Sequence, residues 1–104
     1  MPTPTMPNAV DIGTMITTHP RIHQGVPIIA GTGITVRRIA SDYNHGCSPE
    51  DILAEIPHLT KTQVYAALAF YFANQEMIDA DIAFQAAEAD RLEAEYRAKL
   101  NAKS

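Results

Sequence analysis

Residues 35–74 have the sequence TVRRIASDYNHGCSPEDILAEIPHLTKTQVYAALAFYFAN, in which three helix starts follow one another. Thr35, Ser48 and Thr60 each place a hydroxyl directly before an apolar, helix-periodic segment, where such side chains cap free backbone N–H groups. A proline follows the second cap at once, and a glutamine follows the third cap by three residues, as in a capping box. The segment therefore predicts three helices, over residues 36–45, 49–56 and 60–75.

Helices of these lengths joined by short turns are typical of a trihelical helix-turn-helix core of the homeodomain-like or winged kind. Ahead of them, two short β-branched runs at residues 15–18 and 26–30 predict a small β-hairpin or strand pair. Behind them, residues 76–103 lack glycine and proline and favour a fourth helix. We expect a mainly α fold, in which the strand pair precedes the helix-turn-helix core and a C-terminal helix follows it.

The chain has 104 residues, enough for one domain, and its composition divides it into three parts. Residues 1–14 contain three prolines and no apolar periodicity, so we expect a flexible leader there. Residues 15–75 form the predicted helix-turn-helix domain with its strands, and residues 76–104 form a predicted acidic amphipathic helix. The net charge is −4, and residues 76–104 hold seven acidic and four basic residues, so the excess acid lies in the C-terminal helix.

The sequence lacks the features of several protein classes. Its longest apolar run, residues 64–73, is well short of the ~20 residues that span a bilayer, so we expect no membrane segment. A single cysteine, Cys47, and an N-terminus without a basic start or an apolar block suit the cytoplasm. The histidines and the cysteine do not have the spacing of a zinc site, and no serine elbow, HExxH or P-loop occurs. We therefore expect no metal, no cofactor, no catalytic residues and no enzymatic activity.

The apolar pattern of the third predicted helix differs from that of the first. For the first helix, one buried stripe is predicted at helical spacing: Val36, Ile39, Ala40 and Tyr43. Residues 64–73, in contrast, are apolar on every face, and such a helix is normally enclosed on all sides. We therefore expect the C-terminal helix or another subunit to cover it, and we expect a homodimer or a higher oligomer.

The helix-turn-helix pattern nominates residues for contact with DNA. In such modules the later helix enters the major groove, led by its N-terminal residues. The candidate DNA-binding residues are Lys61, Thr62 and Tyr65 on that helix, with Arg37 and Arg38 as phosphate anchors. The charge argues against this function, because neutralising phosphates supplies most nonspecific affinity and this chain is acidic. A three-helix core that binds no nucleic acid is the alternative.

The C-terminal helix carries a narrow apolar stripe at spacings of three and four residues. An amphipathic helix of this kind binds the groove of a partner protein through its apolar side chains. Two pairs, Glu93 with Arg97 and Glu95 with Lys99, are spaced for ion pairing on the exposed faces. The candidate partner-binding residues are Ile82, Ala89, Leu92, Tyr96 and Leu100.

Four short motifs occur in a fixed order along the chain. They are GVP at 25–27, GTGITV at 31–36, GCSPEDI at 46–52 and PHLT at 57–60. With them, about residues 16–82 resemble the bacterial family catalogued as domain of unknown function 433. Many relatives carry arginines near Ala30 and at Gly33, which this chain lacks, so its turn has less positive charge than theirs.

The resemblance implies a function as well as a fold. Members of that family look like antitoxins of type II toxin–antitoxin systems, often encoded beside a PIN-like ribonuclease toxin, with a winged or homeodomain-like helix-turn-helix. The resemblance thus implies that this chain binds and neutralises a PIN-like toxin and represses its own operon by binding operator DNA. The alternative is a free-standing DNA-binding transcriptional regulator without a toxin partner.

Overall fold

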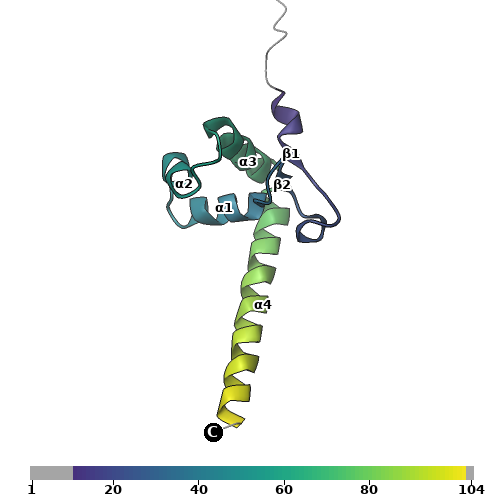
Figure 1. Ribbon diagram of the computed structural model, residues 1–104, viewed down its shortest axis with the longest axis vertical. Helices are drawn as coiled ribbons and strands as arrows, with labels where there is room; N and C mark the ends of the chain where they lie inside the picture. Colours follow the sequence, from purple (N-terminus) through teal and green to yellow (C-terminus); the bar gives the residue numbers. More distant parts are fainter. Residues whose placement is uncertain (1–10, 103–104) are drawn as a thin grey trace, which may run out of the picture.

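The computed structural model describes residues 11–102 (Figure 1). The predicted order of a strand pair, three helices and a C-terminal helix is confirmed, and each helix end falls within two residues of its predicted position. The elements are, with η marking a 3-10 turn, η1 (Ile12–Thr14), β1 (Ile16–Thr17), η2 (His23–Gly25), β2 (Ile28–Ile29), α1 (Val36–Asn44), α2 (Pro49–Glu55), α3 (Lys61–Ala73) and α4 (Gln75–Ala102).

The predicted flexible leader, residues 1–14, lies mostly outside the described residues, which begin at residue 11. Its last part has structure, because Ile12–Thr14 forms one 3-10 turn. The Asp11 side chain stabilises this turn by accepting a hydrogen bond from the Gly13 N–H at 2.9 Å. Apolar periodicity could not indicate the turn, since three residues are too few to show a period.

β1 and β2 form the predicted strand pair, which is antiparallel with Ile16 opposite Ile29. Each strand has two residues, so the pair is shorter than the predicted runs. In the loop between them, three consecutive residues, His23–Gly25, have φ angles of 47°, 59° and 83°. Only glycine adopts this left-handed region freely, so two residues of the turn are strained.

The three predicted helix caps are confirmed. The side chains of Thr35, Ser48 and Thr60 each accept a hydrogen bond from the backbone N–H three residues later. At the last two caps a second bond returns in the other direction, from the Ser48 N–H to Asp51 at 3.0 Å and from the Thr60 N–H to Gln63 at 2.8 Å. A cap of this kind stabilises a helix by about 1 kcal/mol, so local sequence fixes where all three helices begin.

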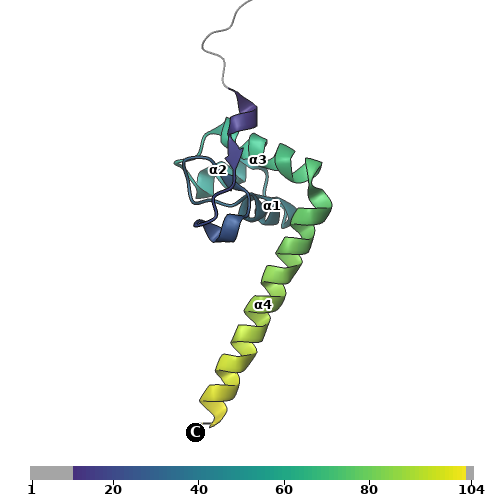
Figure 2. The ribbon, with the colours of Figure 1, turned by 90° about the vertical axis from the view of Figure 1, so that its right-hand side faces the viewer.

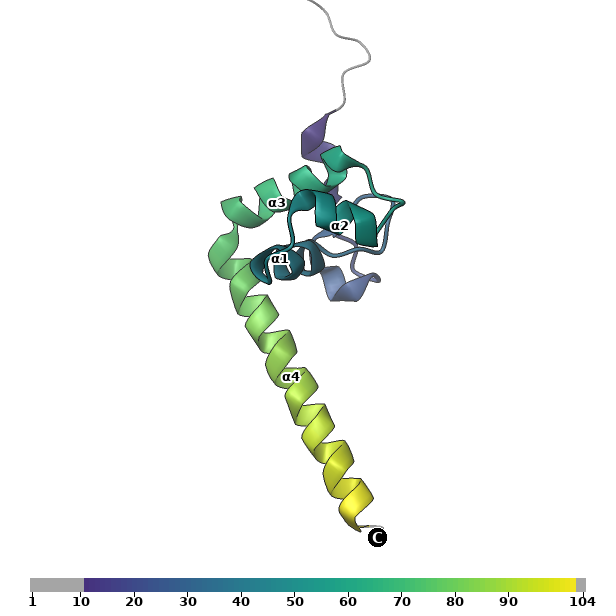
Figure 3. The same cartoon turned by 90° about the vertical axis from the view of Figure 1, so that its left-hand side faces the viewer.

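The core lies among α1, α2 and α3, with β2 against it (Figure 3). α1 and α3 make the most extensive contact, and α2 packs on α3. Burying one such aliphatic side chain contributes about 1.5–3 kcal/mol, so this cluster holds the three helices together. The largest fully buried side chains are Tyr71, Ile29, Ile39, Ile52, Val36 and Val64.

The side of α3 that faces away from the core is exposed in the chain. We call this surface the outer face of α3; it consists of Tyr65 (45% exposed), Phe72 (52% exposed) and the exposed Ala69 between them. Tyr43, predicted to be buried, is also exposed, because it lies at the edge of this face with its ring edge-on to Phe72 at 5.6 Å. Of the two covers expected for α3, the C-terminal helix or another subunit, the C-terminal helix of the same chain does not cover these residues.

α4 follows α3 after one non-helical residue, Asn74 (φ −132°, ψ 36°). The Asn74 backbone N–H and side-chain amide both donate to the Phe70 carbonyl, at 3.1 and 3.0 Å, and so close the end of α3. The chain turns there, and α4 runs past α1 and away from the domain (Figures 1 and 2). With 28 residues, α4 is about 42 Å long. No helix within residues 11–102 combines the length and apolar character needed to cross a bilayer.

Candidate functional site

α4 divides into a base that packs on the domain and an arm that projects from it. In the base, residues 75–82, Ile78 is 3% exposed and Ile82 is half-buried against the core. In the arm, residues 83–102, every side chain is exposed except that of the half-buried Glu88. The exposed large apolar side chains of the arm are Phe84, Leu92, Tyr96 and Leu100.

The structure divides the predicted partner-binding residues between these two parts. Ile82 belongs to the base, where it contacts the core. The other four, Ala89, Leu92, Tyr96 and Leu100, lie on the arm, within about 80° of one another around the helix axis. We call these four residues the apolar stripe. The three large ones are 56%, 63% and 50% exposed, so the stripe is free to contact another molecule.

Two polar contacts fix the base of α4 to the domain. Arg37 Nη1 of α1 lies 2.9 Å from Asp81 Oδ2. The Tyr71 hydroxyl donates to Asp79 Oδ1 at 2.6 Å and accepts from Asn44 Nδ2 at 3.0 Å. The bond to the Asp79 carboxylate raises the pKa of Tyr71 because it favours the protonated phenol, and burial acts in the same direction. The direction of α4 is therefore set by both apolar packing and hydrogen bonds.

The negative charge of α4 is concentrated in its base. Residues 75–82 hold three acidic residues and no basic one, namely Glu76, Asp79 and Asp81. The arm holds four acidic and three basic residues, a net charge of only −1. The prediction of an acidic C-terminal helix thus describes its total charge, but the excess lies beside the domain rather than on the projecting part.

The charged side chains of the arm pair with one another along the helix. Arg97 lies 2.6 Å from Glu93, as predicted. Glu95 pairs with Arg91 at 2.7 Å rather than with Lys99, the partner that its spacing predicted. Arg91 also pairs at 2.9 Å with the glutamate three residues before it. These pairs offset much of the charge of the arm and leave the apolar stripe as its most distinctive surface.

The predicted DNA-contacting residues lie in two separate places. Lys61, Thr62 and Tyr65 are exposed at the N-terminal end of α3, with Lys61 Nζ 5.9 Å from the centre of the Tyr65 ring. Arg37 and Arg38 lie instead on α1, on the side that faces α4. Arg37 is half-buried and pairs with Asp81 in the base of α4, whereas Arg38 is exposed.

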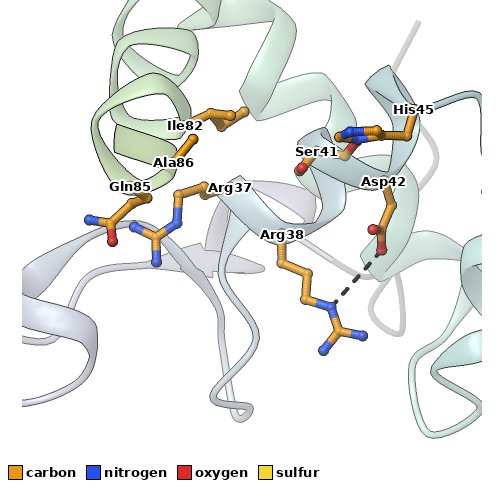
Figure 4. A pocket seen from close by; sticks show the side chains of 8 residues that line it. All are labelled: Arg37, Arg38, Ser41, Asp42, His45, Ile82, Gln85 and Ala86. Carbon is orange, nitrogen blue, oxygen red and sulfur yellow. Dashed lines mark hydrogen bonds and ion pairs between the residues drawn. The ribbon is translucent and has the colours of Figure 1, made fainter. Parts of the chain in front are cut away.

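An open groove of about 430 Å³ lies between α1 and α4 (Figure 4). Within it, Arg38 Nε is 4.0 Å from Asp42 Oδ2, and this buried oxygen accepts no hydrogen bond from the described residues. The His45 Nδ1 atom lies 2.6 Å from the Ser41 carbonyl oxygen, at the C-terminal end of α1. The groove is therefore lined by charged groups from α1 and by apolar and amide side chains from α4.

Cys47 has the environment of an unreactive thiol. Burial, followed by the negative charges of Glu55, Asp42 and Asp51, raises its pKa, so the thiol stays protonated near neutral pH. No group of three histidine, cysteine or carboxylate side chains in the part of the chain that the structure describes is arranged to hold a metal ion.

Sequence patterns alone did not identify the outer face of α3 as a surface. The ten-residue apolar run at 64–73 was the available indication, because one small domain cannot enclose a helix that is apolar on every side. The packing of α1, α2 and α4 against α3 decides which residues of α3 remain exposed, and a local sequence pattern does not show this packing.

Comparison with known proteins gives a family and a structural neighbour. A family model described as "Protein of unknown function (DUF433)" matches residues 16–71. A crystal structure of a DUF433 member protein from Anabaena variabilis ATCC 29413 is similar with a TM-score of 0.62 and 32% sequence identity, over 66% of this chain and 68% of that chain. No curated protein matches the chain. The family match ends at Tyr71, so it covers the strand pair and the three-helix core, whereas α4 lies beyond it.

Proposed function

The chain belongs to the DUF433 family of proteins of unknown function, which indicates its fold but not its activity. We propose that it is an antitoxin-like interaction protein. In this proposal it binds and neutralises a PIN-like ribonuclease toxin through the arm of α4. The observation that supports the proposal is the apolar stripe, which the arm of α4 holds clear of its own domain. A helix with exposed anchors at spacings of three and four residues is suited to a groove in a partner protein.

The affinity would come chiefly from the stripe. Leu92, Tyr96 and Leu100 are each at least half exposed, and full burial of such a side chain contributes about 1.5–3 kcal/mol. Charge has a smaller part, because the arm has a net charge of only −1 and most of its charged groups are paired. The carboxylates beside the stripe would favour a basic cleft, such as one that binds RNA, mainly by speeding association.

A growth-rescue experiment tests this function. The PIN-like ribonuclease of the neighbouring reading frame is expressed at a level that arrests bacterial growth, together with variants of this chain. L92E/Y96E changes the stripe, and A94E/A98E is the matched control, since it adds the same charge on the opposite face of the arm. We expect the full chain and the control to restore growth and L92E/Y96E to fail.

A truncated chain provides a second test in the same growth-rescue experiment. Ending the chain after Gln85 removes the stripe but keeps Ile78, Asp79 and Asp81, which hold the base on the domain. We expect this chain to fold, as shown by its circular dichroism, and to lose rescue. Rescue by the truncated chain, or the absence of any PIN-like reading frame beside the gene, would contradict the proposal.

A free-standing DNA-binding regulator is the second candidate function. It is favoured by the exposure of Lys61, Thr62 and Tyr65 at the end of α3 that a helix-turn-helix inserts into the major groove. It is opposed by the acidic neighbourhood, since Glu50 Oε1 lies 3.5 Å from the Tyr65 hydroxyl. Fluorescence anisotropy with a duplex from the chain's own promoter tests it. This function requires that the chain alone binds the duplex and that K61A loses affinity. The affinity should also fall with salt concentration as expected for a protein that neutralises only a few phosphates.

A further inference from the structure

The groove between α1 and α4 continues into the apolar stripe. Ile82 and Gln85 are two of the residues that line the groove from α4 (Figure 4). Each lies seven positions before a residue of the stripe, Ile82 before Ala89 and Gln85 before Leu92. Residues seven positions apart lie on the same side of an α-helix, because seven residues make almost two full turns. A segment that lies along the stripe and extends toward the domain therefore enters the groove.

α1 supplies a positively charged side chain to this groove. The Arg38 side chain is 55% exposed, and its Nε atom lies 4.0 Å from Asp42 Oδ2, which is too far for a hydrogen bond. Within residues 11–102 the Arg38 guanidinium donates no hydrogen bond, whereas the neighbouring Arg37 is paired with Asp81 at 2.9 Å. Carboxylates bind guanidinium groups through two parallel hydrogen bonds. The donors of Arg38 are therefore available to a carboxylate of another molecule.

The acidic side chains of the base of α4 do not oppose such a carboxylate. Asp79 and Asp81 form the polar contacts that fix the base to the domain, and neither lines the groove. Asp42 is the acidic residue of the lining, and its Oδ2 atom is buried. A carboxylate that enters the groove therefore meets the charge of Arg38 beside uncharged residues of α4. These α4 residues are Ile82, Gln85 and Ala86.

We propose that the groove and the stripe form one binding site for an amphipathic helix of the partner protein, and that Arg38 binds a carboxylate at the end of that helix nearest the domain. This inference rests on the proposed function and adds α1 to its site. The partner helix lies along α4 from Leu100 to Ile82, a distance of about 27 Å or about five turns. The arm has a net charge of −1 and favours basic groups, whereas Arg38 favours an acidic one. Charge therefore fixes the direction in which the partner helix lies along α4.

Isothermal titration calorimetry of the full chain with the PIN-like ribonuclease of the neighbouring reading frame tests the groove. A86E places a carboxylate in the groove, where it takes the position of the partner's carboxylate and leaves a charge against apolar groups. We expect the dissociation constant to rise by at least ~30-fold. A87E is the matched control, because it makes the same change at the next exposed alanine, about 100° around the helix and outside the groove. It should change the constant by less than about three-fold.

Replacing Arg38 tests the predicted contact with a carboxylate. R38Q should raise the dissociation constant by roughly ten-fold and weaken its dependence on salt, since the variant removes an ion pair with the partner. R38K keeps the charge without the paired donors, so its constant should lie between the two. R21Q is the control, because Arg21 is an exposed arginine of the loop between β1 and β2 that does not line the groove. A purely structural role of Arg38 would leave the salt dependence unchanged.

The outcomes separate this inference from the function on which it rests. If L92E/Y96E abolishes binding while A86E and R38Q bind like the unchanged chain, the partner uses the stripe alone and the inference is overturned. If L92E/Y96E binds like the unchanged chain, the proposed function itself is contradicted. Equal losses in A86E and A87E would also overturn the inference, because they would show no preference for the groove. Circular dichroism confirms that each variant is folded, as expected for replacements of exposed side chains.

Discussion

Replacing Ile78 with alanine tests whether the base of α4 is part of the domain. Ile78 is the buried side chain of α4, at 3% exposure, and it belongs to the same core cluster as Ile39 and Tyr71. The substitution removes three carbon atoms at about 0.8 kcal/mol each and leaves a cavity, so we expect a loss of about 3 kcal/mol in the free energy of unfolding. For a domain of typical stability this is a large fraction of the total.

Urea unfolding followed by circular dichroism measures this loss. With a dependence of about 1–1.5 kcal/mol per M urea for a chain of this size, the midpoint should fall by about 2–3 M. L92A is the control, because Leu92 is 56% exposed on the arm, and it should change the free energy of unfolding by less than about 0.5 kcal/mol. Equal losses in the two variants, or a loss below about 1 kcal/mol in I78A, would refute the packing of the base.

Other contacts of the base and core give further expectations. A double-mutant cycle on Arg37 and Asp81 should give a coupling of about 0.5–1 kcal/mol that shrinks in concentrated salt, because the pair is partly exposed; a coupling of zero would mean that the pair does not hold α4. The pKa of Tyr71 is raised in the folded chain, so this tyrosine should add stability below its unfolded pKa of about 10 and lose it as the pH rises through the folded pKa. Urea unfolding across that pH range should show a fall that Y71F lacks, and an identical fall in Y71F would contradict the role of the bond to Asp79. The pKa of the Cys47 thiol is raised, so this thiol should react with a disulfide reagent near pH 8 more slowly in the folded chain than in urea. Equal rates would show that folding does not reduce the reactivity of the thiol.

Local sequence was sufficient for the positions of the helices. Thr35, Ser48 and Thr60 are caps by chemistry that acts over three residues, so each could be predicted without any knowledge of the fold. The strand pair was predicted for a similar reason, since the β-branched runs mark it, although its length was not. These features depend on neighbours in the chain.

The exposed surfaces depend on contacts between residues that are distant in the sequence. The pairing of Arg37 with Asp81 could not be predicted, because the two residues lie 44 positions apart and no local pattern connects them. The spacing of Tyr43 fits a buried stripe, but in the structure Tyr43 lies at the edge of the core and its side chain is exposed. The charge of α4 could be counted from the sequence, whereas its division between base and arm required the point at which α4 leaves the domain.

Because the arm is long, a small change in the direction of α4 at its base produces a large displacement of the C-terminal end of the arm. From residue 83 to residue 102 the arm is about 30 Å long, so a rotation of about 10° at its base moves its tip by about 5 Å. The backbone angles of Asn74 set the direction in which α4 leaves α3, and the contacts of Ile78, Asp79 and Asp81 with the domain hold that direction. Any change of angle at Asn74 would also displace Ile78 from the core, so the packing of the base determines where the tip of the arm lies.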